Sequence, residues 1–296
     1  MGGELFLTLA HVAATAWGAW VFRSVALVDV AGVGAGLLGL VAATRTCIRP
    51  GPGVPLHRLQ DQSLQLAVHA AMTVAGASIL GAAENVGWWW DGAGLSLAGC
   101  WTPDPAYQTL ARAGELYLLA QFMVWAYMGL SCLFLEERSR DFAVMMTHHV
   151  VTVVLVGMAW AGRDWRSAIV CLFLHDASDV FVDLMKIAHY LGLGGPRFGY
   201  ATEGLWALNM VTWVLCRCVL FPLFVHGHIF VQYRVGGATG RLHMLPFFLE
   251  TNALLCLLQC MHVYWCALLA RIGYRALWVE HGARTAAVGA EMYDKN

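Results

Sequence analysis

The stretch DFAVMMTHHVVTVVLVGMAW, residues Asp141–Trp160, is followed after a short connection by RSAIVCLFLHDASDVFVDLMKIA, residues Arg166–Ala188. Both runs are long enough to cross a hydrocarbon core about 30 Å thick, because a helical span needs about 20 mostly apolar residues. The short connection between them predicts an antiparallel helical hairpin. Each run also carries ionisable side chains, which are costly inside a bilayer and therefore face the interior of a helix bundle.

Apolar runs of similar length recur along the chain. The candidate spans are Leu5–Phe22, Ser24–Ala43, Leu66–Ala83, Glu115–Leu135, Phe142–Trp160, Arg166–Ala188, Thr202–His226 and Leu249–Ile272. Of the 296 residues, 59% are hydrophobic and 12% are charged, whereas an average soluble protein carries about 25% charged residues. The predicted fold class is therefore an all-α polytopic membrane protein. The run Leu5–Phe22 lacks the basic start of a cleaved signal peptide, so we interpret it as an extra span.

The net charge and the positions of the cysteines argue against several classes of function. The net charge of −1 gives no indication of nucleic-acid binding. Lysine and arginine are more frequent on the side of the membrane that holds the C-terminal tail, which predicts a cytosolic C-terminus. Of the nine cysteines, seven lie in apolar runs and none forms a CxxC pair, so neither a disulfide framework nor a zinc or redox site is indicated.

The polar residues of the two quoted runs mostly fall on one face of each helix. On the first run they are Asp141, Met145, His148, His149 and Thr152, and on the second His175, Asp176, Ser178, Asp179, Asp183 and Lys186. At a rise of about 1.5 Å per residue, His148 and Asp179 lie roughly 10 and 13 Å from the same membrane boundary. Two histidines opposite three carboxylates at a similar depth favour a functional site over helix–helix hydrogen bonding alone.

Histidine suits the transfer of an acyl group to an amine. An imidazole, with a pKa near about 6.5, can accept the proton that the amine loses. A neighbouring carboxylate would fix the imidazole tautomer and stabilise the imidazolium. Alternatively, one of the two histidines attacks a thioester and forms an acyl-imidazole. The sequence leaves both routes open.

This ordered set of residues closely resembles the longevity-assurance motif of ceramide synthases, which belong to the larger TLC family. The motif is carried by Asp141–Thr152, by His175-Asp176-Ala177-Ser178-Asp179 and by Lys186. The likeness extends over roughly Leu66–Ile272. Within that range it includes Arg217 with Phe221-Pro222, and Asn252, Gln259 and His262-Val263-Tyr264-Trp265.

The resemblance implies a six-helix transmembrane barrel around a lipid-accessible cavity, preceded by one or two N-terminal spans. The expected organisation is an N-terminal membrane segment with a cytosolic loop (1–65), a TLC-like catalytic domain (66–272) and a cytosolic tail (273–296). The implied activity is acyl-CoA-dependent N-acylation of a sphingoid base to (dihydro)ceramide in the endoplasmic reticulum membrane. Long-chain acyl-CoA is then a co-substrate, and membrane lipids are partners. No cofactor, metal or nucleic acid is implied, and a homodimer is compatible with this scaffold.

Carried over position by position, His148 and His149 resemble the catalytic pair, and Asp176 and Asp179 resemble the essential carboxylates. Asp183 stands where the family usually has glutamate. The expected supporting residues are Asp141, Thr152, His175, Ser178, Asp183, Lys186, Arg217, Gln259 and His262. Arg217 lies deep in its span and needs a buried partner, so structural pairing and substrate contact are alternatives. For His262 a packed, hydrogen-bonded role is favoured.

Two other functions fit the same pattern. Imidazoles and carboxylates are metal ligands, so a metal-dependent intramembrane lipid amidase is one alternative, although the chain contains no HxxxH or HxxHH box. The other is a non-enzymatic lipid-binding or transport protein on the same scaffold. Acyl-chain length and the identity of the sphingoid base are not encoded in any recognisable motif.

Overall fold

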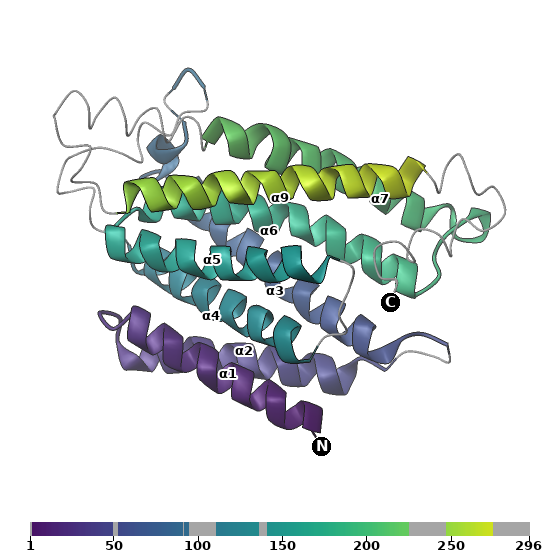
Figure 1. Cartoon of the computed structure of the whole chain (residues 1–296), viewed down its shortest axis with the longest axis horizontal. Helices are drawn as coiled ribbons and strands as arrows, with labels where there is room; N and C mark the ends of the chain where they lie inside the picture. The colour runs from purple at the N-terminus through teal and green to yellow at the C-terminus, as the bar shows by residue number, and fades with distance from the viewer. Residues whose placement is uncertain are drawn as a thin grey trace.

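The computed structural model describes residues 2–49, 53–90, 92–94, 111–135, 141–224 and 247–274. The principal helices are α1 (Gly2–Val21), α2 (Leu27–Cys47), α3 (Leu56–Gly81), α4 (Arg112–Phe134), α5 (Phe142–Gly162), α6 (Trp165–Tyr190), α7 (Ala201–Trp213) and α9 (Phe248–Tyr274). A π-helical segment, η5 (Val214–Leu220), continues α7, and two short 3-10 turns are η1 (Val86–Trp88) and η4 (Pro196–Phe198). Figure 1 shows the long helices lying side by side, with α1 and α2 on one side of the bundle and α7 and α9 on the other.

Six of the described helical segments are long and apolar enough to cross a membrane. They are Leu27–Cys47, Leu56–Gly81, Arg112–Phe134, Phe142–Gly162, Ala201–Phe224 and Phe248–Tyr274. On α5, Val150 is 55% exposed, whereas the neighbouring His149 is 8% exposed. Apolar side chains on the outside and polar side chains inside are expected for a helix in a lipid bilayer, because polar groups are costly in contact with lipid. The protein is thus an all-α polytopic membrane protein, as the sequence predicts.

The predicted boundaries are wrong at two places. Helix α2 runs from Leu27 to Cys47 rather than from Ser24 to Ala43, and α3 begins at Leu56 rather than at Leu66. The polar sequence before Leu66 had indicated a loop, but Gln60 is buried and its amide donates to the backbone carbonyls of Arg45 and Ile48. These bonds satisfy the polar groups and tie the start of α3 to the end of α2, so the helix extends by almost three turns.

The α5–α6 hairpin is built as predicted. Helix α5 ends at Gly162, and Arg163 adopts the left-handed conformation with φ 60°. The N–H of Asp164 donates back to the carbonyl of Ala159 at 2.9 Å, which is a helix-ending bond of the Schellman type. Helix α6 begins immediately afterwards at Trp165. The tight reversal places the polar faces of α5 and α6 in one bundle.

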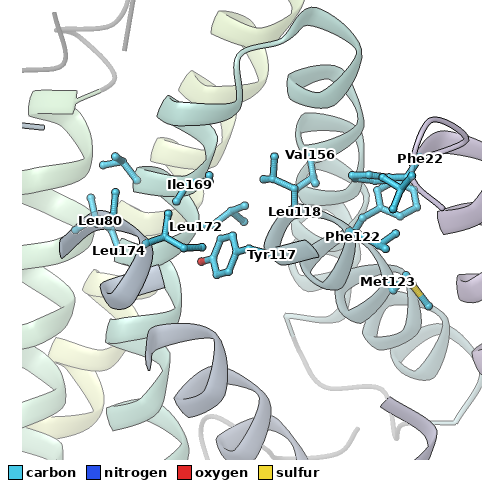
Figure 2. Close-up of a cluster of buried hydrophobic side chains, with 14 of the residues drawn as sticks. Phe22, Leu80, Tyr117, Leu118, Phe122, Met123, Val156, Ile169, Leu172 and Leu174 are labelled. Carbon is cyan, nitrogen blue, oxygen red and sulfur yellow. The ribbon is translucent and has the colours of Figure 1, made fainter. Parts of the chain in front are cut away.

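Apolar packing joins the N-terminal helices to the rest of the bundle. Phe22, at the end of α1, is fully buried, and its ring lies 5.6 Å from that of Phe122 on α4 and 4.4 Å from that of Trp160 on α5. Figure 2 shows this cluster continuing through Tyr117 and Leu118 on α4 to Ile169, Leu172 and Leu174 on α6. Glycine permits a close approach of α3 to α6, because a Cβ at Gly76 would lie 3.1 Å from the Phe173 ring, and small residues let membrane helices pack closely.

Two predictions concern residues that the structure does not describe. His226, the predicted end of the seventh span, and the tail from residue 275 lie outside the described residues. The described cysteines are all free thiols.

Candidate active site

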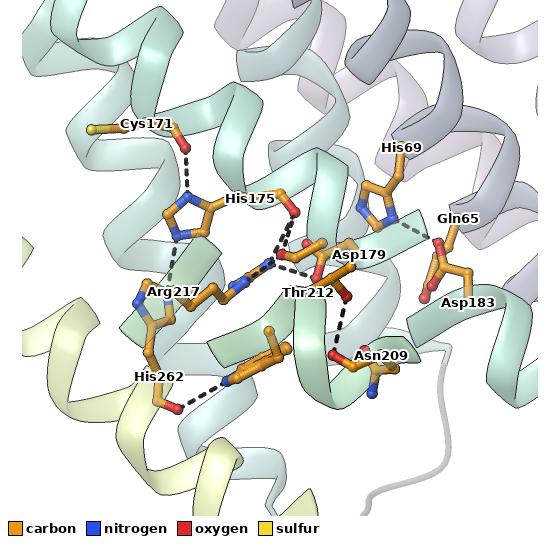
Figure 3. A network of polar contacts seen from close by, with 12 residues as sticks. Gln65, His69, Cys171, His175, Asp179, Asp183, Asn209, Thr212, Arg217 and His262 are labelled. Carbon is orange, nitrogen blue, oxygen red and sulfur yellow. Dashed lines mark hydrogen bonds and ion pairs between the residues drawn. The ribbon is translucent and has the colours of Figure 1, made fainter. Parts of the chain in front are cut away.

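Helix α6 is the centre of the polar core, because its three carboxylates reach three different neighbours. Asp176, Asp179 and Asp183 are spaced three and four residues apart, so they occupy one broad face of the helix. Asp176 faces α4, Asp179 faces η5, and Asp183 faces α3. Figure 3 shows the last two contacts on either side of α6. The carboxylates therefore join α6 to three neighbouring segments of the bundle.

Asp176 is held by α4. The amide of Gln121 donates to Asp176 Oδ2 at 2.5 Å, and the hydroxyl of Tyr117 donates to the same oxygen at 3.2 Å. The Gln121 amide oxygen in turn accepts a bond from the Trp125 indole N–H at 2.9 Å. Asp176 is 1% exposed and Gln121 is fully buried, so this network is sealed from the membrane. Tyr117, Gln121 and Trp125 recur every fourth residue on one face of α4.

Asp179 forms an ion pair with Arg217. The Arg217 Nη2 lies 2.5 Å from Asp179 Oδ1, while its Nε donates to the Ser178 hydroxyl at 2.8 Å. The guanidinium also lies over the Trp213 ring, 4.4 Å from its centroid. Arg217 is 2% exposed, and a buried guanidinium is tolerated only when it is paired and hydrogen-bonded. The structure thus supplies the buried partner that the sequence required for Arg217.

The π-helical geometry of η5 has a local cause and a consequence. Pro222 lacks a backbone N–H and so removes one bond from the helical ladder. The widened turns of η5 end at Leu220, and residues 221–224 are α-helical again. π-helical turns inside helices are frequent at functional sites. Here the segment carries Arg217 into contact with α6.

Asp183 is held by α3, through two residues that the sequence reasoning missed. His69 Nδ1 lies 2.7 Å from Asp183 Oδ2, and the Gln62 amide donates to Asp183 Oδ1 at 2.5 Å. Lys186, one turn further along α6, is half-buried and also interacts electrostatically with Asp183. His69 lies inside a predicted span as its one ionisable residue, and Gln62 lies in a predicted loop. Their spacing of seven residues was the only available signal.

His148 and His149 point into the bundle. They are 5% and 8% exposed, and their rings flank Trp125, at 5.4 and 5.7 Å from its ring centroid. His148 also contacts Trp265 on α9 at 5.4 Å. No described residue is hydrogen-bonded to Nδ1 of either imidazole. Asp179 interacts electrostatically with His149, and a direct carboxylate partner for this pair stays a prediction.

The remaining predicted residues fall around this centre. The Trp265 indole donates to Asp141 Oδ2 at 3.2 Å, which ties the start of α5 to α9. The Thr152 hydroxyl donates to the His148 carbonyl at 2.9 Å within α5. His175 Nε2 and His262 Nε2 lie 2.9 Å apart, so His262 is a packed, hydrogen-bonded residue, as favoured. Gln259 Oε1 has no partner among the described residues.

The His175–His262 contact defines both tautomers. His175 Nδ1 lies 2.7 Å from the Cys171 carbonyl, and a carbonyl only accepts, so Nδ1 of His175 carries the proton. In the neutral ring its Nε2 is then the acceptor, and His262 Nε2 is the donor. His262 is fully buried. This pair braces α6 against α9 beside the Asp179–Arg217 ion pair.

An apolar cavity of about 70 Å³ reaches this centre from the α5–α6 turn. Its walls come from α5, α6, the end of η5 and α9, and include Leu155, Leu172, Phe221 and Leu258. At one end lie Trp125, Thr152 and His175, and at the other Asp164 and Ser167. The cavity is thus an apolar passage with the polar centre at one end.

Asp164 is the polar group at the far end of the cavity. It precedes α6 and accepts a hydrogen bond from the Ser167 hydroxyl. Burial raises the pKa of the Asp164 carboxyl to about 7, while the bond from Ser167 acts in the opposite direction. The carboxyl therefore titrates near neutral pH. Within the described ranges, no three His, Cys, Asp or Glu side chains are grouped in a way that could hold a metal ion.

The fold and the site together define a polytopic helical membrane protein with a buried His–Asp centre that meets an apolar cavity at Trp125, Thr152 and His175. Residues 58–271 match the family model of the TLC domain, which covers α3 to α9. The chain belongs to the TLC domain family.

The similar proteins include several ceramide synthases. Ceramide synthase LOH2 of Arabidopsis thaliana is 32% identical over 173 residues, which are 56% of this chain and 55% of that protein. ASC1-like protein 3 of Oryza sativa subsp. japonica is 34% identical over 162 residues, or 53% of this chain and 54% of that protein. Human Ceramide synthase 5 is 25% identical over 191 residues, or 64% and 44%. The chain spans about half the length of the curated relatives it matches.

Proposed function

We propose that the protein transfers a fatty acyl group from acyl-CoA to the amine of a sphingoid base, giving (dihydro)ceramide. The observation that carries the proposal is the buried imidazole pair, His148 and His149, packed against Trp125, which lines an apolar cavity. Membership of the TLC family and similarity to proteins named ceramide synthases support the substrate class.

The imidazoles are suited to act on the thioester. Their Nδ1 atoms are buried and not hydrogen-bonded to any described residue, so the lone pair of a neutral ring is not already committed there. One imidazole attacks the thioester carbonyl and forms an acyl-imidazole, or it accepts the amine proton while the amine attacks directly. Both routes place the reacting carbonyl beside Trp125, between the two rings.

The ionic groups around the pair are suited to stabilise charge. The Asp179–Arg217 ion pair, fixed by Ser178 and Trp213, lies on the α6 side of the centre. Fixed charges in a site that excludes water stabilise developing charge without reorganisation. Asp176 is already bound by Gln121 and Tyr117, so its proposed role is to hold α4 and Trp125 in place.

The cavity is suited to an aliphatic chain. Its lining is mostly apolar, with Thr152, His175, Thr251 and the Asp164–Ser167 end as the polar exceptions, and burying methylene groups there gains about 0.8 kcal/mol each. We propose the endoplasmic reticulum membrane as the location, with a cytosolic C-terminus. Acyl-CoA is the co-substrate in this proposal, and no cofactor takes part.

The test is amide formation by membranes that contain the protein, supplied with long-chain acyl-CoA and sphinganine. We expect the wild type to make dihydroceramide, and His148→Ala or His149→Ala to reduce the rate at least about 100-fold, the usual range for loss of an acid–base or nucleophilic group. The matched control is His11→Ala, since His11 is a buried histidine on α1, away from the centre. An inactive wild type that still binds sphinganine would instead indicate a non-enzymatic lipid-binding protein.

A further inference from the structure

His69 on α3 is the histidine of the polar core that a carboxylate directly orients. Its Nδ1 lies 2.7 Å from Asp183 Oδ2, and the other oxygen of Asp183 accepts the Gln62 amide at 2.5 Å. Gln62 is positioned in turn by Gln65, at 3.0 Å. Both carboxylate oxygens are therefore engaged, and the imidazole is fixed in one orientation. Figure 3 shows the contact between His69 and Asp183.

This geometry defines the tautomer of His69. An ionised carboxylate only accepts hydrogen bonds, so Nδ1 carries the proton and Nε2 of the neutral ring carries the lone pair. Nε2 is buried and has no hydrogen-bond partner among the described residues. A buried acceptor is normally satisfied. An imidazole with one nitrogen bound to Asp and the other free is the arrangement of a general base.

His69 lies beside the proposed reaction centre and amid its negative charge. Its ring is 6.0 Å from that of Trp125, the residue that His148 and His149 flank and that lines the cavity. Besides Asp183, both Asp176 and Asp179 on α6 interact with His69 electrostatically. His149 on α5 is the opposing cationic neighbour when protonated.

His148 has different surroundings. The groups that interact with it electrostatically are Arg217 and the histidines His149, His175 and His69. A proton on His148 would thus face positive neighbours, whereas a proton on His69 would face three carboxylates. The surroundings of His69 thus suit it to accept a proton, and those of His148 suit it to hold the acyl group.

We propose that His69 is the proton acceptor of the reaction and that Asp183 positions it, while His148 and His149 engage the acyl group. This inference rests on the proposed function. As the amine nitrogen bonds to the acyl carbonyl carbon, its proton passes to His69 Nε2, which becomes imidazolium. The C–S bond to CoA breaks and leaves a thiolate. The thiolate then takes the proton from His69, which yields CoA thiol and restores the neutral imidazole.

A purely structural role for the same residues is a hydrogen-bonded brace between α3 and α6. The two roles differ in what a substitution does. His69→Gln retains an amide that can donate to Asp183 but has no titrating base, so a brace survives it and a base does not. Asp183→Glu retains the carboxylate, whereas Asp183→Asn removes its charge. Comparing these two variants therefore shows whether the negative charge of residue 183 is needed, or only its hydrogen bond to His69.

The experiment measures steady-state dihydroceramide synthesis by the full chain in membranes, with detergent-solubilised melting as the folding control. We expect His69→Gln to lower kcat about 100-fold or more with little change in the KM for acyl-CoA, and to remove the acidic limb of the pH–rate profile. We expect added imidazole to restore part of the activity of His69→Ala. Asp183→Asn should lower kcat more than Asp183→Glu, and His11→Ala should leave kcat unchanged.

Three outcomes would overturn the inference. One is a His69→Gln protein with wild-type kcat and an unchanged pH profile. Another is a loss of activity that only follows a loss of melting temperature and that imidazole does not rescue in His69→Ala. If neither His69 variant folds, equal kcat values for Asp183→Asn and the wild type would overturn it. A wild type that forms no amide would overturn the proposed function itself, which is a separate result.

Discussion

At the scale of single residues, the polar core is a set of buried charges that are each satisfied by a different helix. Arg217 is the most demanding, being 2% exposed and bonded to Asp179, Ser178 and the carbonyl of His175. Removing one partner of such a pair leaves an uncompensated charge, which costs about 3–5 kcal/mol in soluble proteins. The pair therefore has a structural role that is measurable apart from catalysis.

A double-mutant cycle on Asp179 and Arg217 measures that role. We expect Arg217→Gln and Asp179→Asn each to lower the melting temperature strongly, and the double variant to lose less than the sum of the two, because neither charge is then left alone. The measurement is thermal unfolding of the detergent-solubilised variants. Additive losses would mean that the two side chains stabilise the bundle independently.

Asp164 gives a second prediction, on pH. Burial raises its folded-state pKa to about 7, whereas an unfolded aspartate titrates near about 3.9. The folded state thus binds more protons between these values, so stability falls as pH rises through that interval and levels off above about 7. We expect Asp164→Asn, which keeps an oxygen to accept the Ser167 bond, to be as stable as the wild type at pH 4 and more stable at pH 8.

Thermal unfolding across that pH range checks the sign. A melting-temperature advantage of Asp164→Asn that grows from acid to neutral pH agrees with the prediction. An advantage at acid pH that disappears toward neutral pH contradicts it.

At the scale of elements, close approach of α4 to α5 positions the histidine pair. A Cβ at Gly129 on α4 would lie 3.2 Å from His149 Cβ, so a side chain there must push α5 away. We expect Gly129→Ala to displace His149 and to lower the rate of amide formation at least several-fold. The intrinsic effect of the substitution on helix stability is favourable, by about 1 kcal/mol.

The control for this substitution is Gly36→Ala on α2, where an added Cβ meets no atom within 4 Å. We expect that variant to melt at or above the wild-type temperature and to keep full activity. Equal activity of Gly129→Ala and Gly36→Ala would show that the α4–α5 distance does not control the site.

The elements also show what a single sequence can and cannot predict. The apolar runs predicted the helices, because length and hydropathy decide which segments span a bilayer. The start of α3 was missed, since Gln60 and Gln62 look like loop residues until their partners, the carbonyls at the end of α2 and the carboxylate of Asp183, are known. The polar faces of α5 and α6 were predicted correctly, because residues on one face of a helix recur every three or four positions and can be found within a single segment.

Partnerships between distant segments were beyond local patterns. His69 and Asp183 are separated by 114 positions, and nothing in the spacing of either helix specifies which carboxylate meets which histidine. The sequence predicted a carboxylate beside His148 and His149, and it gave no indication of the direct carboxylate contact that the structure shows at His69. The Gln121–Asp176 bond was missed for the same reason.

At the scale of the whole molecule, the bundle separates an apolar exterior from a polar centre that an apolar cavity connects to the α5–α6 turn. Helices α1 and α2 pack against α4, outside the segment that matches the TLC domain, and so support the helix that carries Gln121 and Trp125. The arrangement places the buried histidines beside an apolar cavity and away from water.

The most direct test of the account is an experimental structure of the protein with a bound acyl-CoA or with its amide product. We predict the carbonyl carbon beside the imidazoles of His148 and His149, next to Trp125, with an aliphatic chain running along Leu155 and Leu172 toward Asp164. A carbonyl found outside the bundle, with the imidazoles and the cavity unoccupied, would contradict the account.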